Sequence, residues 1–445
     1  MIQTVENIGE KLVSMLTYDA SQPLIFSSGL FLFLFAGFLF FYGFTRRAPM
    51  ARIVYVILFS LYFYYKSSGI YFLLLVFASV SDYWIAHAIY KVRTQRAKYW
   101  LVGLSVLVNL GMLGYFKYTN FLIEIANNLF GQGFLNFQNI FLPVGISFFV
   151  FQSMSYTIDI CRGQLKPLNN WADYLFYLSF FPQLVAGPIV RAKDFIPQIR
   201  QNPLRVTREM FGMGVFLILI GLFKKAVISD YISLNFVDRI FDEPLLYSGF
   251  ECLMGIYGYA LQIYCDFSGY SDMAIGIALL LGFRFPKNFD APYKSATITE
   301  FWRRWHISLS TWLRDYLYIA LGGNRKGRIR TYFNLLVTML LGGLWHGAAV
   351  RFILWGALHG IALALHKLWL SVVPGSKATG AEMRWFWRIP GIFFTFNLVC
   401  FGWLMFRAES MKTVQLMLHQ IFTNFNPSVL SLIHISEPTR LRRIS

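Results

Sequence analysis

The sequence predicts an all-α, polytopic integral membrane protein. Hydrophobic residues make up 56% of its 445 residues and charged residues only 14%, whereas about a quarter of an ordinary soluble protein is charged. The mean hydropathy is +0.51, and many apolar runs approach the ~20 residues that a membrane-spanning helix requires. Together these observations exclude a water-soluble enzyme, a disordered chain and a disulfide scaffold.

The apolar runs set the expected order of helices, with about 10–12 of them embedded in the membrane. They fall at residues 24–44, 53–65, 70–90, 99–116, 140–160, 171–187, 209–228, 249–264, 268–283, 332–346, 350–370 and 389–406. An amphipathic segment at residues 1–22 is expected to lie on the membrane surface. Because Pro182 and Pro188 interrupt any helix over residues 171–187, we expect a re-entrant loop there.

The charge balance, 40 Lys and Arg against 22 Asp and Glu, is typical of the basic cytoplasmic loops of membrane proteins. Basic clusters follow the first and third runs and recur at residues 191–208 and 325–330. Placing them in the cytoplasm puts the N-terminus outside. We therefore expect the lipid bilayer as a partner and no nucleic acid.

Residues 300–323 predict an amphipathic helix. Thr297 and Glu300 have the spacing of a capping box, which predicts the helix start. The aromatic and aliphatic face comprises Phe301, Trp305, Leu309, Trp312 and Tyr316, and the opposite face comprises Arg303, Ser310 and Arg314. Such a helix is typical of a membrane surface.

Two roles are open for this helix, and His306 lies at the border of its two faces. It either anchors to lipid only, or it covers an active site that admits an anionic cytoplasmic donor. Arg303, Arg304 and Arg314 are suited to such a donor because guanidinium groups bind phosphate and carboxylate oxygens in pairs.

His346 lies in a glycine-containing break between two apolar runs. The first run rises only about 20 Å from the inner surface at 1.5 Å per residue, so this imidazole should lie within the bilayer. An ionisable group at that depth is a functional candidate, and a neutral imidazole can act as a general base on a hydroxyl. The alternative is a histidine bonded to a backbone carbonyl, and we interpret His359 as structural.

Asp266 is the remaining candidate within an apolar region. Asp266 and Asp272 are six residues apart, so they do not share a helical face as an acid–base pair would. Asp266 either orients a histidine, binds a polar substrate, or forms a hydrogen bond between helices. The sequence has no cluster with the ligand spacing of a zinc site, so we expect no metal.

Four motifs follow one another in a characteristic order, within a resemblance that runs from roughly Pro23 to Arg407. They are FFPQLVAGP at residues 180–188, DFSGYSD at 266–272, FWRRWH at 301–306 and GLWHG at 343–347. Together they resemble the membrane-bound O-acyltransferase family, and within it the bacterial alginate O-acetyltransferase membrane subunits.

The resemblance implies a ring of helices around a central funnel. A cytoplasmic acyl thioester such as acetyl-CoA would enter as a substrate, with no bound cofactor. It implies that His346 is catalytic and that His306 is the second recurrent position. The residues then expected to bind donor or substrate are Arg303, Arg304, Arg314, Asp266 and Trp305.

The expected reaction moves an acyl group, taken to be acetyl, onto a hydroxyl of an exported polysaccharide at the bacterial inner membrane. Transfer would be direct or through an extracytoplasmic esterase-like partner protein. Peptidoglycan O-acetylation and teichoic acid D-alanylation are alternatives of the same chemistry. A polar-solute transporter or flippase, and a scaffold for a secreted acyltransferase, are alternatives of other classes.

The domain that carries the resemblance is expected to span residues 23–429 and to be incomplete at its C-terminus. Residues 430–445 read like the translation of a sequencing-library adapter. We expect His434 in this tail to carry no function.

Overall fold

A computed structural model describes residues 10–427 apart from 12, 46, 186, 202–204, 374 and 377–382. In these residues the regular structure consists of helices, which confirms the all-α prediction. Five helical runs are long and apolar enough to cross a membrane: Pro49–Lys91, Gln95–Phe130, Arg208–Asp242, Val350–Val372 and Trp385–Arg407. The chain is therefore a multi-pass membrane protein. The predicted tail and the first nine residues lie outside the described part, and the ring around a funnel stays a prediction.

The chain divides into two compact units. Unit 1 comprises the chain up to Leu222 together with Tyr270–Asn288, and unit 2 comprises Phe223–Gly269 and the chain from Phe289 onward. The boundary falls within α14 (Gly249–Leu280), a single helix of 32 residues. The apolar runs 249–264 and 268–283 are thus parts of one helix.

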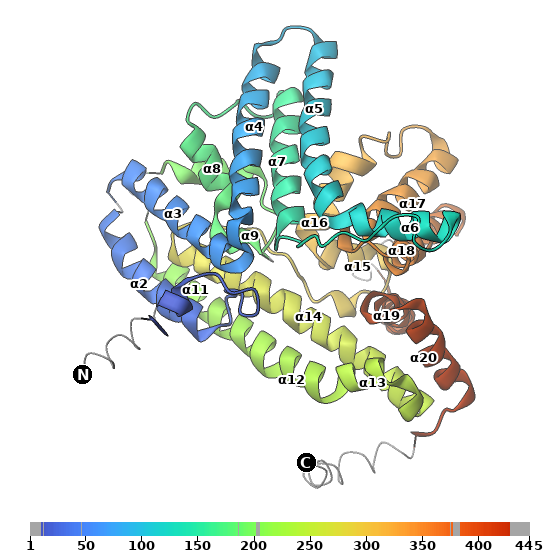
Figure 1. Ribbon diagram of the computed structural model, residues 1–445. Helices are drawn as coiled ribbons and strands as arrows, with labels where there is room; N and C mark the ends of the chain where they lie inside the picture. The colour runs from blue at the N-terminus through green and yellow to red at the C-terminus, as the bar shows by residue number, and fades with distance from the viewer. Residues whose placement is uncertain are drawn as a thin grey trace, which may run out of the picture. The chain divides into compact units, whose positions relative to one another are not determined.

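Unit 1 is built on three helices, α4, α5 and α7, that pack side by side (Figure 1). Its helices are α2 (Gly29–Thr45), α3 (Pro49–Ser68), α4 (Phe72–Lys91), α5 (Gln95–Leu113), α6 (Thr119–Phe130), α7 (Ile146–Cys161), α8 (Trp171–Ser179), α9 (Phe181–Leu184), α10 (Ala192–Ile199) and α11 (Arg208–Leu222). The buried Asp82 carboxylate accepts hydrogen bonds from Ser105 (2.7 Å), Asn109 (2.6 Å) and Ser153 (2.5 Å). Because these donors come from α5 and α7, the network fixes the packing of both helices on α4.

The break predicted within residues 171–187 is confirmed. α8 ends at Ser179, and α9 begins at Phe181 with a proline in its first turn. The side chains of residues 173–184 are buried, as irregular backbone in a membrane requires. A Cβ on Gly145 would lie 2.0 Å from the Leu184 carbonyl oxygen, so glycine lets the start of α7 approach this segment.

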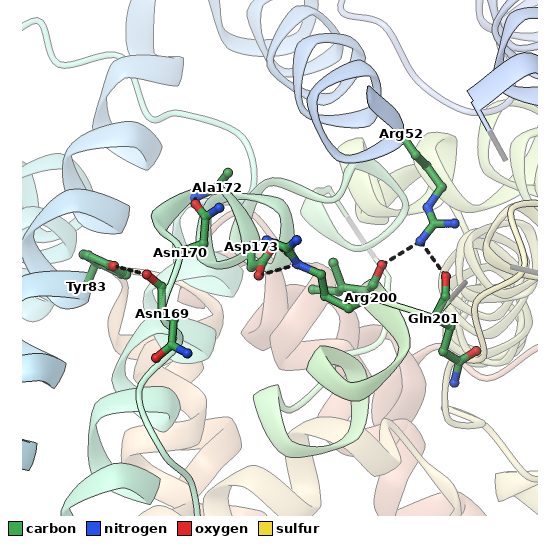
Figure 2. A network of polar contacts seen from close by, with 9 residues as sticks. Arg52, Tyr83, Asn169, Asn170, Ala172, Asp173, Arg200 and Gln201 are labelled. Atoms are coloured by element: carbon green, nitrogen blue, oxygen red, sulfur yellow. Dashed lines mark hydrogen bonds and ion pairs between the residues drawn. The ribbon is translucent and has the colours of Figure 1, made fainter. Parts of the chain in front are cut away.

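Polar contacts tie the short helices of unit 1 to α3 (Figure 2). Arg200 Nε donates to both carboxylate oxygens of Asp173, at 3.0 and 2.9 Å. Arg52 Nη2 donates to the carbonyls of Ile199 and Gln201, at 2.8 and 2.9 Å. The end of α10 is therefore joined to α8 on one side and to α3 on the other.

Unit 2 is centred on an antiparallel pair of helices, α17 and α18. Besides the N-terminal part of α14, its helices are α12 (Asp230–Ile232), α13 (Asp238–Asp242), α15 (Ile298–Arg304), α16 (Ile307–Trp312), α17 (Gly327–His346), α18 (Val350–Val372), α19 (Trp385–Arg407) and α20 (Met411–Thr423). Lys367, near the end of α18, donates to Asn324 Oδ1 (2.7 Å), just before α17 begins. The opposite ends of α17 and α18 therefore meet at the turn that follows His346.

Candidate active site

The predicted helix over residues 300–323 is broken at His306. Thr297 caps α15 by accepting from the Glu300 amide (3.1 Å), and Glu300 accepts from the Ala296 amide (3.0 Å). Trp305 is extended, and His306 has φ +42°, a left-handed conformation uncommon for residues other than glycine. α16 then starts anew and leads into a π-helical turn at Leu313–Tyr318. The prediction of one continuous helix is wrong because hydrophobic periodicity does not specify the sign of φ.

The aromatic face of this segment is buried in protein. Trp305 stacks on Phe301 with ring centroids 5.7 Å apart and lies 4.8 Å from the ring of Trp403. The five residues of the face are 1 to 7% exposed. The interpretation as a lipid anchor is therefore wrong, because the face packs against other helices of unit 2.

The two candidate histidines both lie close to Trp345. The indole of Trp345 is 6.2 Å from the His306 ring and 4.9 Å from the His346 ring, measured between centroids. His306 is fully buried, whereas His346 is half-buried. His346 also contacts Trp355 (5.1 Å) and Phe406 (5.2 Å) edge-on. Of the two histidines, His346 is therefore the one with exposed surface.

His306 lies outside the spanning helices, and its environment keeps it neutral. Burial lowers the pKa of His306 well below its ordinary value of 6.5, and the charge of His346 lowers this pKa further. The two imidazoles therefore interact electrostatically. At pH 7 His306 is a neutral imidazole, which can donate or accept a hydrogen bond.

The glycine-containing break at His346 is confirmed. α17 ends at His346, Gly347 is extended (φ −162°), and α18 begins at Val350. A Cβ on Gly347 would lie 2.0 Å from Cε2 of Phe352, and one on Gly343 would lie 2.1 Å from the Phe352 carbonyl oxygen. Glycines on both sides of His346 thus let α18 pack directly against the end of α17.

A cavity of about 500 Å³ lies among α15, α16, α17 and α18. Arg303, Arg314 and Lys367 line it, together with Asn324 and several apolar side chains. Trp302 forms part of its wall. The Trp302 indole is 5.7 Å from that of Trp355, which contacts His346, so two indoles connect the cavity wall to the histidine.

The other predicted binding residues are placed elsewhere. Arg304 pairs with Glu300 (2.8 Å) and, like the buried Trp305, does not line the cavity. Asp266 of α14 pairs with Lys225 (2.7 Å), which lies in the helical turn Phe223–Ser229. The structure thus brings Arg303 and Arg314 together, while the binding roles of Arg304, Trp305 and Asp266 stay predictions.

Two further residues bear on the site. His359 is fully buried among the rings of Phe301, Trp302 and Trp355, which agrees with the structural interpretation.

Sequence reasoning missed Arg351, although it is a basic residue at the start of an apolar run. Its guanidinium lies over the ring of Phe352 and donates to the backbone carbonyl of Phe406.

Comparisons with known proteins show the family to which the chain belongs. The chain matches the membrane-bound O-acyltransferase family over residues 164–411. It is 43% identical to a "Probable alginate O-acetylase" of Azotobacter vinelandii, over 94% of this chain and 82% of the relative. It is 37% identical to a peptidoglycan O-acetyltransferase of Helicobacter pylori (88% and 78% covered) and 31% identical to a teichoic acid D-alanyltransferase of Streptococcus thermophilus (71% and 77%). The chain therefore belongs to the membrane-bound O-acyltransferase family and is an O-acyltransferase.

Proposed function

We propose that the protein transfers acetyl groups from a cytoplasmic thioester to hydroxyls of an exported polysaccharide, with alginate as the leading candidate. The observation that carries the proposal is the half-buried His346 beside the neutral, buried His306. The names of the A. vinelandii and H. pylori relatives support acetyl as the acyl group. Family membership favours this reaction over a transporter or scaffold.

In the proposed reaction, His346 takes the proton from the acceptor hydroxyl. The acceptor oxygen attacks the thioester carbonyl carbon, and the negative charge that develops on the carbonyl oxygen needs a hydrogen-bond donor. His306, a buried and neutral imidazole, is our candidate for this donor. When the carbon–sulfur bond breaks, the thiolate takes the proton back from His346, so a thiol and an ester are the products.

The donor site in this proposal is the cavity lined by Arg303, Arg314 and Lys367. Three cationic side chains suit the phosphates of acetyl-CoA, and apolar residues such as Leu335 and Leu363 suit its uncharged arm. The cavity lies near the basic residues 325–330, which the charge distribution places in the cytoplasm.

We place the protein in the bacterial inner membrane, with the acceptor arriving from outside. The acceptor hydroxyl belongs either to the polysaccharide or to an extracytoplasmic esterase-like partner that relays the acetyl group. Peptidoglycan is the second candidate acceptor, which the H. pylori relative supports.

The test is acetyl transfer from radiolabelled acetyl-CoA by purified protein in lipid vesicles. His346→Ala should abolish acceptor-dependent transfer, because no other group takes the hydroxyl proton. His419→Ala is the matched control, since His419 is exposed on α20 and has no part in the proposed reaction. Transfer by His346→Ala at the wild-type rate would contradict the proposed role.

A further inference from the structure

We propose that α6 and the loop after it form a lipid-binding platform that lies in the interface at one surface of the bilayer. The platform comprises α6 (Thr119–Phe130) and residues 131–142. Its ligands are the phospholipids of that leaflet, which it contacts through the upper part of their acyl chains. This surface belongs to unit 1, and the inference does not depend on the proposed transfer reaction.

α5 reaches the far side of the membrane before α6 begins. α5 has 19 residues, and the π-helical turn Gly114–Tyr118 adds five. At 1.5 Å per residue these rise about 36 Å, whereas the hydrocarbon core of a bilayer is about 30 Å thick. The first turns of α5 lie beside the basic residues Arg93, Arg96 and Lys98, which stay outside the hydrocarbon. α6 therefore begins where the hydrocarbon ends.

α6 does not continue along the axis of α5. Figure 1 shows α6 turning aside after the end of α5, so that the two helices lie crosswise. A π-helical turn is a common cause of such a bend. The whole helical run Gln95–Phe130 has 36 residues. If it were straight it would be about 54 Å long, more than the roughly 40–45 Å of a whole bilayer. The bend instead lets α6 lie along the membrane surface.

The exposed side chains of α6 separate into an apolar and a polar face. Leu122, Ile125 and Leu129 have the spacing of one helical face and are 61, 38 and 72% exposed. Glu124 and Asn128 are exposed one turn apart on another face. This separation is typical of a helix that lies in the plane of the membrane interface.

The loop is held on α6 by two asparagine side chains. Asn120 Nδ2 donates to the Gln138 carbonyl (2.8 Å), and Asn120 Oδ1 accepts from the Gln138 amide (2.9 Å). Asn127 forms the same pair of bonds with Leu135, at 2.9 and 2.8 Å. These four bonds satisfy backbone groups that lipid could not satisfy. The loop can therefore lie against lipid while it presents two further exposed rings, Phe134 and Phe137.

Lipid is the occupant that the composition and position of the platform favour. Glu124 is its only charged residue, and its other polar side chains are mostly amides, so it lacks the charges that orient a partner protein. An exposed stripe on α5, formed by Leu104, Leu107 and Leu110, leads toward α6. The exposed Tyr115 follows at the level where aromatic rings gather in membrane proteins. Acyl chains cover that stripe, and the same leaflet can cover the apolar face of α6.

The test measures membrane depth at single positions of the full chain in phosphatidylcholine vesicles. Cys161 is first replaced by serine, because the other three native cysteines are buried. One cysteine is then added and labelled with the fluorophore NBD. Its quenching is compared for iodide in the water and for phosphatidylcholine brominated either near the headgroup or near the chain end.

Leu129→Cys and Phe137→Cys should lose quenching by iodide. Lipid brominated near the headgroup should quench both labels more strongly than lipid brominated near the chain end, because the platform lies in the interface. Asn128→Cys is the matched control, since it neighbours Leu129 but lies on the polar face, and it should keep its quenching by iodide. All three positions are exposed, so the changes should leave the fold intact.

Three results would overturn the proposal. Equal quenching by iodide at Leu129→Cys and Asn128→Cys would place the apolar face in water, where a soluble partner could bind it. Protection of Leu129→Cys from both iodide and brominated lipid would show that protein covers the face. Stronger quenching by lipid brominated near the chain end would place α6 across the bilayer.

Discussion

At His306 the backbone adopts a left-handed conformation in which a side chain of this size is strained. Such conformations persist where the surroundings impose them, and they are common at functional sites. Here the conformation ends α15 and lets α16 start in a new direction. It thereby places a buried imidazole beside Trp345 instead of on the surface of a continuous helix.

Burial of His306 makes the stability of the protein depend on pH. The folded state keeps His306 neutral because its pKa is lowered, whereas the unfolded chain takes up a proton near 6.5. This contribution to stability is therefore complete above pH 6.5 and is lost as the pH falls below it. We expect thermal unfolding in detergent to occur at lower temperature at about pH 5.5 than at about pH 7.5.

The variant His306→Asn identifies the group responsible. Asparagine does not titrate, and it tolerates the left-handed conformation better than most residues. Its unfolding temperature should vary less with pH than that of the wild type. Equal pH dependence in both proteins would assign the effect to other groups.

The sequence identified single residues only where their context was unusual. His346 was predicted because a histidine beside a glycine, deep in an apolar run, has few uses other than function. The burial of Phe301 and Trp305 followed from their spacing, but the partner against which they pack did not. The hydrogen bond from Arg351 to the carbonyl of Phe406 could not be predicted, because the two residues are distant in the sequence.

At the scale of elements, close contact between α17 and α18 positions the end that carries His346. A Cβ on Gly356 would lie 2.3 Å from the Met339 carbonyl oxygen, so the helices would have to separate. We expect Gly356→Ala to destabilise the protein by about 1–3 kcal/mol and to lower activity through displacement of His346. Thermal unfolding and acetyl transfer measure the two effects.

Gly111→Ala in α5 is the matched control. Nothing lies within 4 Å of the Cβ that this change would add, and alanine is favoured over glycine in a helix by about 0.5–1 kcal/mol. It should leave stability unchanged or raise it slightly. Equal losses in both variants would refute the close-contact argument.

The elements that the sequence predicted were those with a continuous apolar run. α18 and α19 were found almost to their ends. α6 and α20 were missed because both are short and bury only a few residues each, which gives no long apolar run. The length of α14 was also missed, because polar residues around Asp266 resemble an interruption although the helix continues through them.

For the whole molecule, the distribution of basic residues predicts which loops face the cytoplasm. The loop that follows α6 should face outward, since α5 begins next to a basic cluster. A membrane-impermeant maleimide should therefore label Gln132→Cys in intact spheroplasts and should label Lys326→Cys only after permeabilisation. Both residues are exposed, and three of the four native cysteines are buried, so background labelling should be low. The reverse pattern would invert the topology.

The aromatic contacts around His346 also have an optical consequence. Trp302, Trp355, Trp403 and Trp305 follow one another with ring centroids 5.7, 6.2 and 4.8 Å apart. Indoles held this closely in a chiral arrangement share their electronic excitations and give paired circular-dichroism bands of opposite sign. The amplitude of those bands reports the order of the rings next to His346, so the protein carries its own spectroscopic probe of the site.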